Sequence, residues 1–515
     1  MYIIVPEEPG KRAKRAEKNR SVRKGEQHMA VITLNPERSR GTISKNIYGH
    51  FSEHLGRCIY QGVYVGENSA IPQVRGIRTD VVEALKKIHL PVLRWPGGCF
   101  ADEYHWRDGI GPKESRKRMV NTNWGGVVED NSFGTHEFLD LCEQVGCEPY
   151  FSANVGSGTV REMAEWIEYT NSDGDSSVVR ERRANGREDA WGVKYWGIGN
   201  ESWGCGGNMR AEYYADVYRR YQTFCRTYGK NKPFRIASGS SGLDYHWTEV
   251  LMREAAPMMD GISVHYYTVC GDTWEKKGSA TDFTEEEYYK TLHKAAYIDE
   301  VISQHDAIMT RYDPEKRVGL IVDEWGTWFD VEPGTNPGFL YQQNTMRDAL
   351  VAAVSLNIFN RHCDRVTMAN IAQLVNVLQS VILTEGEKMV LTPTWHVFDL
   401  YQAHQDAKEI DCFVGTGSIG PEKWAVERIS ASASSREGRY TVTAANLDAD
   451  QPEEIRITGV RASRAEARVL SGEMHAKNDF EQEMLTTKPL PVTVEENGDL
   501  TLTLPACAVA EIRFS

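Results

Sequence analysis

The chain has 515 residues, 41% of them hydrophobic and 26% charged, and its formal net charge is −14. This length predicts a large domain with a smaller second domain, because one ordinary core does not grow to this size. The negative charge argues against a nucleic-acid-binding surface and suits a neutral substrate such as a sugar. The sequence shows neither an apolar run that could span a bilayer nor the apolar segment of a secretory signal. We therefore expect a cytoplasmic protein without membrane contact.

The first 28 residues are basic and contain almost no apolar residue after Val5. We interpret residues 1–28 as a disordered extension, or as sequence upstream of a start at Met29, with a nucleic-acid-binding arm as the alternative. They are left out of the fold prediction.

Residues 46–397 alternate short apolar runs with longer amphipathic stretches, a pattern typical of repeated β/α units. Eight such units favour an α/β fold with a closed (β/α)8 TIM barrel over an open doubly wound sheet. The predicted strands are Ile47–Phe51, Val92–Gly98, Pro149–Val155, Val193–Asn200, Phe234–Ser238, Gly261–Tyr267, Gly319–Glu324 and Val366–Gln373. Helices are expected between them, including Asp80–Ile88, Thr135–Val145, Val160–Tyr169, Ala211–Tyr228 and Gln342–Leu356.

Residues 398–515 have a different pattern, in which short alternating segments are separated by turn residues. The segments are Arg439–Ala445, Glu454–Ile457, Ala465–Leu470 and Leu500–Leu504. This pattern predicts an antiparallel β-sandwich. Residues 29–45 contain one isolated strand, Val31–Leu34, which we expect to pair into that sandwich.

Glu201 ends the fourth predicted strand, in the run Tyr-Trp-Gly-Ile-Gly-Asn-Glu. The carboxyl ends of barrel strands converge on one face, where active sites are built. A carboxyl group at the edge of an apolar pocket has a raised pKa and can donate a proton near neutral pH. We therefore predict that Glu201 is a general acid/base; the alternative is a salt bridge or a cap on the following helix.

Glu324 ends the seventh predicted strand, in the run Gly-Leu-Ile-Val-Asp-Glu-Trp-Gly. A nucleophilic carboxylate must stay ionised, which requires cations or hydrogen-bond donors around it. Arg94 and a tyrosine from the sixth strand are the candidates. In a small barrel, strands four and seven lie on opposing sides, so Glu201 and Glu324 can flank one sugar. The alternative for Glu324 is a structural pair with an arginine.

Five motifs, taken in order along the chain, resemble those of the α-L-arabinofuranosidases of glycoside hydrolase family fifty-one. The first is Tyr48-Gly49-His50-Phe51-Ser52-Glu53-His54, and the last is Asn370-Ile371-Ala372-Gln373. The other three are Leu93-Arg94-Trp95-Pro96-Gly97-Gly98, Gly197-Ile198-Gly199-Asn200-Glu201 and Asp323-Glu324-Trp325. The resemblance runs from about Ala30 to the carboxyl terminus. It implies an exo-acting, retaining enzyme that removes terminal α-L-arabinofuranosyl groups from arabinan, arabinoxylan and arabino-oligosaccharides by double displacement, without a cofactor. It also implies a homo-oligomer, for which the family offers the hexamer as one form, and the sequence does not establish the number of subunits.

The resemblance assigns the acid/base to Glu201 and the nucleophile to Glu324, in agreement with the interpretation of the strand ends. It implies substrate contacts from Glu53, Asn200, Tyr267 and Gln373, and support of Glu324 by Arg94. From the register alone, either Tyr266 or Tyr267 could face the nucleophile. Without the family, Arg94 fits a barrel-internal salt bridge and Gln373 a buried core amide equally well.

The ten cysteines show neither a C-x-x-C pair nor zinc-ligand spacing, so we expect reduced thiols. Cys99 follows a Gly-Gly turn and is predicted to be a small wall residue of the sugar site rather than a nucleophile. His50, His54 and His265 lack the H-E-x-x-H pattern, so we predict no metal and assign His265 a supporting role.

The loop Asn121–Asn131, with Trp124, and the tryptophans Trp203 and Trp328 are the candidates for walls around the sugar and its leaving group. Ordinary packing is the alternative for each of them. Two rival functions remain open on the same sequence. One is a β-xylosidase or endo-β-glucanase on the same barrel, and the other is a non-catalytic sugar-binding protein.

Overall fold

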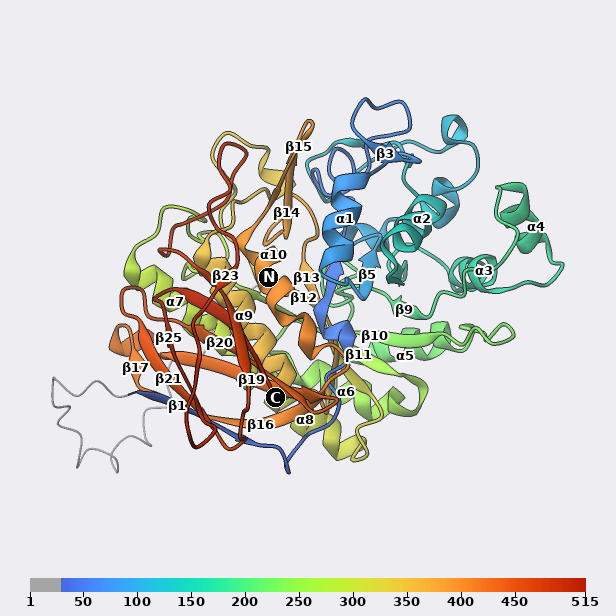
Figure 1. Ribbon diagram of the computed structural model, residues 1–515. Coiled ribbons are helices and arrows are strands. Elements are labelled where there is room, and N and C mark those ends of the chain that lie inside the picture. Colours follow the sequence, from blue (N-terminus) through green and yellow to red (C-terminus); the bar gives the residue numbers. More distant parts are fainter. Residues whose placement is uncertain (1–28) are drawn as a thin grey trace.

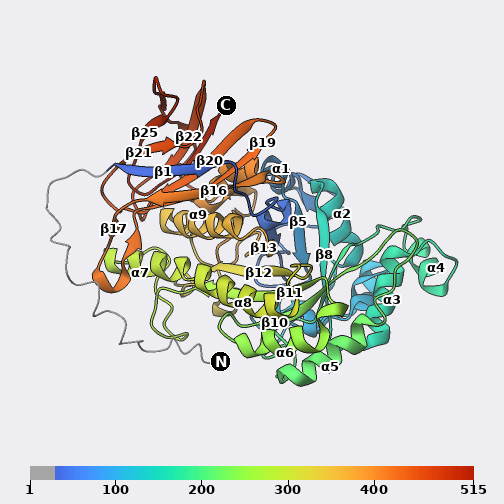
Figure 2. The ribbon, with the colours of Figure 1, turned by 90° about the horizontal axis from the view of Figure 1, so that it is seen from below.

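The computed structural model describes residues 29–515, and the predicted extension at residues 1–28 lies outside this range (Figure 1). The described chain contains a closed barrel of parallel strands and a ten-stranded sheet formed mainly by its carboxyl-terminal part. Figure 2 shows this sheet packed against one side of the barrel. The predicted fold class is therefore confirmed.

The barrel contains eight strands in chain order, each parallel to its neighbours. Pairing of the fourth strand with the fifth completes the ring, so no strand edge is left open. All eight predicted strands are present. Their bounds are β2 (Gly49–Phe51), β5 (Val92–Trp95), β8 (Glu148–Ala153), β9 (Tyr195–Ile198), β10 (Phe234–Ser240), β11 (Gly261–Thr268), β12 (Gly319–Thr327) and β13 (Val366–Ala372).

Amphipathic helices connect the strands and bury their apolar sides against the barrel (Figure 2). The helices are α1 (Thr79–Lys87), α2 (Thr135–Val145), α3 (Val160–Asn171), α4 (Ser177–Ala184), α5 (Ala211–Gln222), α6 (Tyr245–Ala255), α7 (Glu285–Ala296), α8 (Ile298–Tyr312), α9 (Met346–Arg361) and α10 (Pro393–Tyr401). Small two-stranded sheets lie in the loops. They are β3 (Gln73–Val74) with β4 (Ile77–Arg78), β6 (Met119–Val120) with β7 (Val128–Glu129), β14 (Ile382–Glu385) with β15 (Lys388–Leu391), and β17 (Ser418–Ile419) with β18 (Val426–Glu427).

Three predicted helix bounds are wrong, one of them at the carboxyl end of the helix expected over Gln342–Leu356, which continues to Arg361. The helix expected to reach Tyr228 ends at Gln222, because Tyr228 instead exchanges backbone hydrogen bonds with Asn231 in a tight turn. The helix expected from Gln342 begins at Met346. Thr345 caps it, since its backbone N–H donates to the Asp348 carboxylate three residues ahead at 2.8 Å.

The second body is a ten-stranded sheet in the order β23-β22-β26-β20-β19-β16-β1-β21-β25-β24. Strand β1 (Ala30–Asn35) pairs antiparallel with β16 and parallel with β21. Residues from both halves of this order share one apolar core, so the sheet folds over on itself as a sandwich. The other strands are β16 (Lys408–Gly415), β19 (Ile429–Arg436), β20 (Arg439–Asn446), β21 (Glu453–Thr458), β22 (Ala465–Ser471), β23 (Lys488–Pro489), β24 (Thr493–Val494), β25 (Leu500–Leu504) and β26 (Ala508–Phe514).

Helix α9 joins the two bodies. Its residues from Met346 to Asn360 are all buried, because one side faces the barrel and the other faces the sheet. Polar side chains on the sheet side are paired: Asn360 donates to Ser432 Oγ at 3.0 Å. The boundary expected between residues 397 and 398 falls inside α10.

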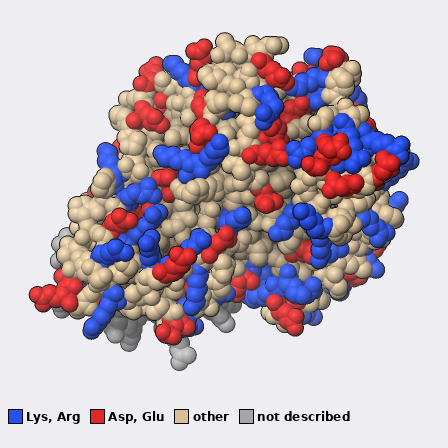
Figure 3. Space-filling model, turned by 45° about the vertical axis from the view of Figure 1, so that its right-hand side comes forward, with Lys and Arg blue, Asp and Glu red and all other residues tan. Residues whose placement is uncertain are grey.

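On the face drawn in Figure 3, basic and acidic side chains are interspersed rather than separated into patches. Among residues 29–515, no helix combines the length and apolar character needed to cross a membrane.

Candidate active site

The carboxyl ends of the barrel strands place seven predicted polar residues around one point. Glu53 follows β2, Arg94 lies in β5 and Asn200 and Glu201 follow β9. His265 and Tyr267 lie in β11, and Glu324 lies in β12. The polar contacts described below connect six of these side chains into one network, and Glu53 lies beside it with hydrogen bonds of its own.

Glu201 is presented by a backbone turn that leaves β9 abruptly. Gly199 has φ 89° and Glu201 has φ 41°, so two residues within three occupy the left-handed region. Glu201 Oε1 lies 2.9 Å from Nδ1 of His265. Burial raises the pKa of Glu201 and outweighs the lowering effect of His265, and the neighbouring Glu324 raises it further. The group can therefore hold a proton at higher pH than an exposed glutamate.

Glu324 is surrounded by donors. Its Oε1 accepts a hydrogen bond from Nη1 of Arg94 at 2.8 Å, and its Oε2 accepts one from the hydroxyl of Tyr267 at 2.8 Å. Burial and the charge of Glu324 raise the pKa of Tyr267 well above its usual value, so the hydroxyl remains a donor. A cation and a fixed hydroxyl donor thus occupy one oxygen of Glu324 each.

The two carboxylates meet at the same ring nitrogen of His265. Its Nδ1 lies 2.9 Å from Glu201 Oε1 and 3.5 Å from Glu324 Oε2. One oxygen of each carboxylate and one nitrogen of His265 all lie within 4.8 Å of one another. The structure thus brings Glu201 and Glu324 together, as the strand count predicted.

His265 is held between three acidic side chains, with Asp323 Oδ1 3.1 Å from its Nε2. Burial acts to lower the pKa of His265, but Glu324, Asp323 and Glu201 together raise it to about 10. An imidazolium carries hydrogen on both nitrogens, so it has no lone pair to offer a metal ion. The cationic His265 thus contacts Glu201, Glu324 and Asp323 at once, and we call this arrangement the charge bridge.

Arg94 is 1% exposed and connects three strands of the barrel. Its Nη2 donates to Asn200 Oδ1 at 2.6 Å, and its Nε donates to Ser152 Oγ at 3.1 Å. Burial would lower the pKa of Arg94, but Asp323 and Glu324 raise it above its usual value. The arginine is therefore a permanent positive charge beneath the site.

Glu53 lies at the other side of the site and accepts three hydrogen bonds. Trp124 Nε1 donates to its Oε1 at 2.9 Å, the Phe100 backbone N–H to the same oxygen at 3.1 Å, and Gln373 Nε2 to its Oε2 at 3.1 Å. Burial and then Glu324 raise the pKa of Glu53 to about 7 against the lowering effect of these donors. Gln373 Oε1 has no hydrogen-bond partner among residues 29–515, which leaves it free to meet a ligand hydroxyl.

Sequence comparison identifies the family of this site. Two domain families match the chain, the α-L-arabinofuranosidase 1 domain over residues 84–284 and the α-L-arabinofuranosidase C-terminal domain over residues 323–508. The chain is 53% identical over 503 residues to an intracellular exo-α-L-arabinofuranosidase of Bacteroides ovatus, covering 96% of this chain and 97% of that protein. The chain belongs to the α-L-arabinofuranosidases of glycoside hydrolase family 51.

Solved structures of family 51 agree with this assignment. The arabinofuranosidase of Xanthomonas axonopodis pv. citri has a TM-score of 0.93 at 47% identity, over 95% of this chain and all of that one (100%). The Thermotoga maritima α-L-arabinofuranosidase, solved as an arabinose complex, has a TM-score of 0.82 at 30% identity, over 94% of this chain and 99% of that one. The predicted family is therefore confirmed.

The choice between the two tyrosines of this family 51 chain is settled by the register of β11. Tyr267 points inward and donates to Glu324, whereas Tyr266 donates to the backbone carbonyl of Lys294 on α7 at 2.7 Å. Side chains of successive strand residues lie on opposite faces, so only one of the two can reach the site.

The expectation of ten reduced thiols is wrong for two of the cysteines. Cys99 and Cys205 form a disulfide, and the other eight cysteines, all within residues 29–515, are free. The 106 residues between Cys99 and Cys205 gave no spacing pattern, and only the closed barrel brings the ends of β5 and β9 together. The Cys205 and Cys99 sulfurs lie 3.5 Å and 4.0 Å from Glu201 Oε2, so the disulfide lies beside this carboxylate.

Two buried carboxylates of this family 51 site were missed by the sequence analysis. Asp323 supports His265 and accepts the hydroxyl hydrogen of Tyr150 at 2.7 Å. Asp102 fixes the turn before Glu201, since its Oδ2 accepts the Asn200 backbone N–H at 3.0 Å. Asp323 directly precedes Glu324 in the motif Asp323-Glu324-Trp325, and this position in the motif could have indicated a role for it.

The three predicted tryptophans are all half-buried, but each makes different contacts. Trp124 holds Glu53, as described above, while Trp203 Nε1 donates to the Gly239 carbonyl at 3.1 Å. The Trp328 ring packs edge-on against Tyr267, with ring centres 4.9 Å apart, and contacts Trp274, which the sequence analysis did not single out. These contacts place Trp328 against the tyrosine that holds Glu324, and Trp203 against the carboxyl end of β10.

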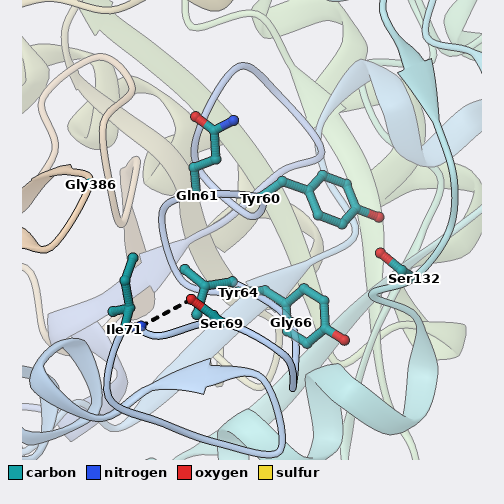
Figure 4. A pocket seen from close by; sticks show the side chains of 9 residues that line it. Tyr60, Gln61, Tyr64, Gly66, Ser69, Ile71, Ser132 and Gly386 are labelled. Atoms are coloured by element: carbon teal, nitrogen blue, oxygen red, sulfur yellow. Dashed lines mark hydrogen bonds between the residues drawn. The ribbon is translucent and has the colours of Figure 1, made fainter.

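A hollow of about 410 Å³, apart from the carboxylates, is lined by residues from the loops after β2 and β5 and by Gly386 between β14 and β15. Figure 4 shows Tyr60 and Tyr64 side by side at its wall.

Tyr60 donates to the buried Glu129, which also accepts from His54 Nδ1 at 2.9 Å. Because Trp95 Nε1 donates to His54 Nε2, the hydrogen of that histidine is directed at Glu129.

Proposed function

We propose that this family 51 protein is a retaining exo-α-L-arabinofuranosidase that releases terminal α-L-arabinofuranosyl groups from arabinan, arabinoxylan and arabino-oligosaccharides. One observation carries the proposal. Glu201 and Glu324 both approach Nδ1 of His265, and one oxygen of each lies within 4.8 Å of the other. Retaining glycosidases hold their two carboxyl groups about 5–5.5 Å apart, and inverting ones about 6.5–9.5 Å apart. The shorter spacing supports double displacement.

In the first step, the ionised Glu324 attacks the anomeric carbon and forms a glycosyl-enzyme. Arg94 and Tyr267 support this role because they donate to both carboxylate oxygens and fix the orientation of the group. Glu201 donates its proton to the leaving oxygen as the glycosidic bond breaks. Its buried position, which raises the pKa of Glu201, supports the role of an acid.

In the second step, Glu201 is ionised and takes a proton from water, which attacks the anomeric carbon and releases Glu324. His265 remains beside both groups as their charges reverse. Since the raised pKa of about 10 keeps His265 cationic, it can stabilise whichever carboxylate is charged.

Glu53, Asn200 and Gln373 are proposed to bind the hydroxyl groups of the arabinofuranose. Glu53 and Gln373 are joined by a hydrogen bond at one side of the site, and Asn200 is oriented by Arg94 at the other. Each leaves polar atoms for a ligand, such as the unpartnered Oε1 of Gln373 among residues 29–515. Fixed polar groups of this kind give a sugar site its orientation.

A panel of nitrophenyl glycosides tests the proposal. We expect cleavage of the α-L-arabinofuranoside and little or no cleavage of the β-D-xyloside. NMR of the first product formed should show the α-anomer of arabinose, since two inversions restore the starting configuration. Preferred cleavage of the xyloside, or internal cleavage of a β-glucan, would favour the rival hydrolases. Tight sugar binding without turnover would favour a sugar-binding protein.

The Bacteroides ovatus relative is named as intracellular, and we propose a cytoplasmic location for this protein as well. A homo-oligomer, with the hexamer as one form, stays a prediction. Light scattering coupled to size-exclusion chromatography measures it, and a mass of one 58.2 kDa chain would reject it.

A further inference from the structure

The disulfide between Cys99 and Cys205 connects two loops that form opposite sides of the acid/base position. Cys99 begins the short helix after β5, and Cys205 lies in the loop after β9, four residues beyond Glu201. Cys205 is exposed and Cys99 is half-buried, so solvent and small thiols can reach the bond. Gly98, next to Cys99, lies so close to Glu324 that an added Cβ would be 3.0 Å from its Oε1. The bond therefore anchors a turn that borders both carboxylates.

The two oxygens of Glu201 have different surroundings. Oε1 is held by His265 at 2.9 Å, whereas Oε2 lies against sulfur, 3.5 Å from Cys205 and 4.0 Å from Cys99. A disulfide sulfur carries no hydrogen and cannot donate to a carboxylate. Oε2 is therefore the oxygen left to hold the proton that Glu201 transfers.

Reduction changes what Oε2 meets. A Cys205 thiol 3.5 Å away carries an S–H that can donate, weakly, to the charged form of Glu201. The other charged or titratable groups that face Glu201 stay in place, since they belong to barrel strands: Arg94 of β5, His265 and Tyr267 of β11, and Glu324 of β12. The sulfur pair is thus the part of this environment whose hydrogen-bonding character depends on a redox reaction.

Disulfides are rare in cytosolic proteins, where those that occur are mostly transient, catalytic or redox-sensing. We propose that the Cys99–Cys205 pair is a redox-responsive positioning element, which keeps Glu201 a strong proton donor when oxidised and weakens it when reduced. The inference rests on the proposed function, because it assigns Glu201 the role of acid/base.

The reaction is thiol–disulfide exchange with a cellular dithiol as reductant. A reductant thiolate attacks the exposed Cys205 sulfur, forming a mixed disulfide and releasing Cys99 as a thiolate that takes up a proton. The second reductant thiolate then attacks the sulfur bonded to Cys205 and releases Cys205. The reductant ends as a disulfide, and its two hydrogens end on Cys99 and Cys205.

The functional consequence follows from the weak hydrogen bond. Stabilising the charged form of Glu201 makes it a poorer acid, so the alkaline limb of the kcat/KM profile moves to lower pH by about 0.5 unit. The loss is expected in kcat for substrates with poor leaving groups, which need protonation most. KM should change little, because the sugar contacts of Glu53 and Gln373 lie elsewhere in the site.

The test incubates the full chain in glutathione buffers from oxidising to reducing. Alkylation followed by mass spectrometry reports the state of Cys99 and Cys205, and it is readable even if the protein does not cleave arabinofuranosides. In parallel, kcat and KM are measured from pH 5 to 9 on arabino-oligosaccharide and on nitrophenyl arabinofuranoside. We expect the alkaline limb to follow the fraction of reduced pair.

Three variants make the result specific. Cys99→Ala leaves the Cys205 thiol beside Glu201, so its alkaline limb should match the reduced enzyme in every buffer. Cys99→Ala/Cys205→Ala has neither sulfur and should not respond to reductant. Cys147→Ala removes a half-exposed free cysteine between α2 and β8, and its redox response should equal that of the wild type.

Several outcomes would overturn the inference. A pair that stays reduced in oxidising buffer, or oxidised in every buffer, is not redox-responsive. A response that persists in the double variant belongs to other cysteines. An alkaline limb that does not move when the pair is reduced shows that the sulfurs do not act on Glu201. Absence of arabinofuranoside cleavage in both redox states, by contrast, rejects the proposed function itself.

Discussion

Tyr267 donates its phenolic hydrogen to Oε2 of Glu324 over 2.8 Å, from the strand next to the one that carries Glu324. The opposite oxygen is held by Arg94, so the carboxylate has one donor for each oxygen. The ring of Trp328 packs edge-on against Tyr267 and limits how far the phenol can turn. The hydrogen bond is therefore a fixed part of the site rather than a chance contact.

Tyr267→Phe should lower kcat/KM about 10- to 150-fold, since a hydrogen bond to a charged group contributes about 1.5–3 kcal/mol. Tyr266→Phe is the matched control, because its hydroxyl bonds the Lys294 carbonyl outside the site. That variant should keep kcat/KM within about twofold and lose about 1 kcal/mol of stability. Steady-state kinetics and thermal unfolding of both variants measure this, and equal kinetic losses would contradict it.

The roles of the two glutamates can be separated with azide. Glu201→Ala should lose about 10²- to 10⁴-fold on substrates with poor leaving groups and much less on activated ones. Azide can then attack the glycosyl-enzyme, and the product should be the α-L-arabinofuranosyl azide. Glu324→Ala forms no glycosyl-enzyme, so azide should attack the substrate directly and give the β-azide.

NMR of the azide products distinguishes the two anomers. Glu249→Ala is a suitable control, because Glu249 is a surface carboxylate paired with Arg311. It should behave as the wild type, with no effect of azide. The same azide anomer from both active-site variants, or equal loss on all leaving groups for Glu201→Ala, would reject the assigned roles.

The barrel and the two carboxylates were predictable because both follow from local patterns. Buried parallel strands are continuous apolar runs, and the polar residues that end them, such as Glu201 and Glu324, are visible in sequence. Convergence of the strand ends is a property of the architecture, so the strand count is enough to predict that these residues lie together.

What could not be predicted depends on contacts between distant segments. The Cys99–Cys205 bond joins loops 106 residues apart and has no local signature. The role of Asp102 depends on accepting the Asn200 backbone N–H, which only the folded turn reveals. The end of α5 at Gln222 was missed because the Tyr228 turn overrides helical periodicity that continues in the sequence.

Glu53 gives a prediction about pH. Its pKa is raised to about 7, by burial first and by Glu324 next, so it is protonated at pH 5 and ionised at pH 8.5. A carboxylate accepts stronger hydrogen bonds from sugar hydroxyls than a neutral group does. Glu53→Gln should therefore resemble the wild type near pH 5 and lose about tenfold or more in kcat/KM near pH 8.5.

The Gln variant can be accommodated. The Gln373 amide can turn so that its Oε1, unpartnered among residues 29–515, accepts from the new amide at position 53. Trp124 can still donate to the remaining carbonyl oxygen. A ratio of wild-type to variant kcat/KM that is constant from pH 5 to 8.5 would contradict the role of the charge on Glu53.

His265 gives a prediction about stability. Burial opposes its charge, but Glu324, Asp323 and Glu201 raise its pKa to about 10, above the usual value of 6.5. Because the folded protein binds this proton more tightly than the unfolded chain, the stabilisation is complete below about pH 6.5. It is lost as the pH rises toward about 10, where folded His265 also becomes neutral.

His265→Gln should therefore be less stable than the wild type by about 3–5 kcal/mol near pH 6.5, since it removes the cation that Glu201 contacts and leaves Glu324 and Asp323 with Arg94 alone. The difference in urea midpoint should shrink steadily as the pH approaches 10, because the wild type loses the same charge. His246→Gln, which removes an exposed histidine paired with Glu212, should show no such pH-dependent difference. A difference in urea midpoint between His265→Gln and the wild type that stays constant over this range would mean that His265 is neutral in the folded protein. The interpretation of His265 as a charge bridge for Glu201 and Glu324 would then be wrong.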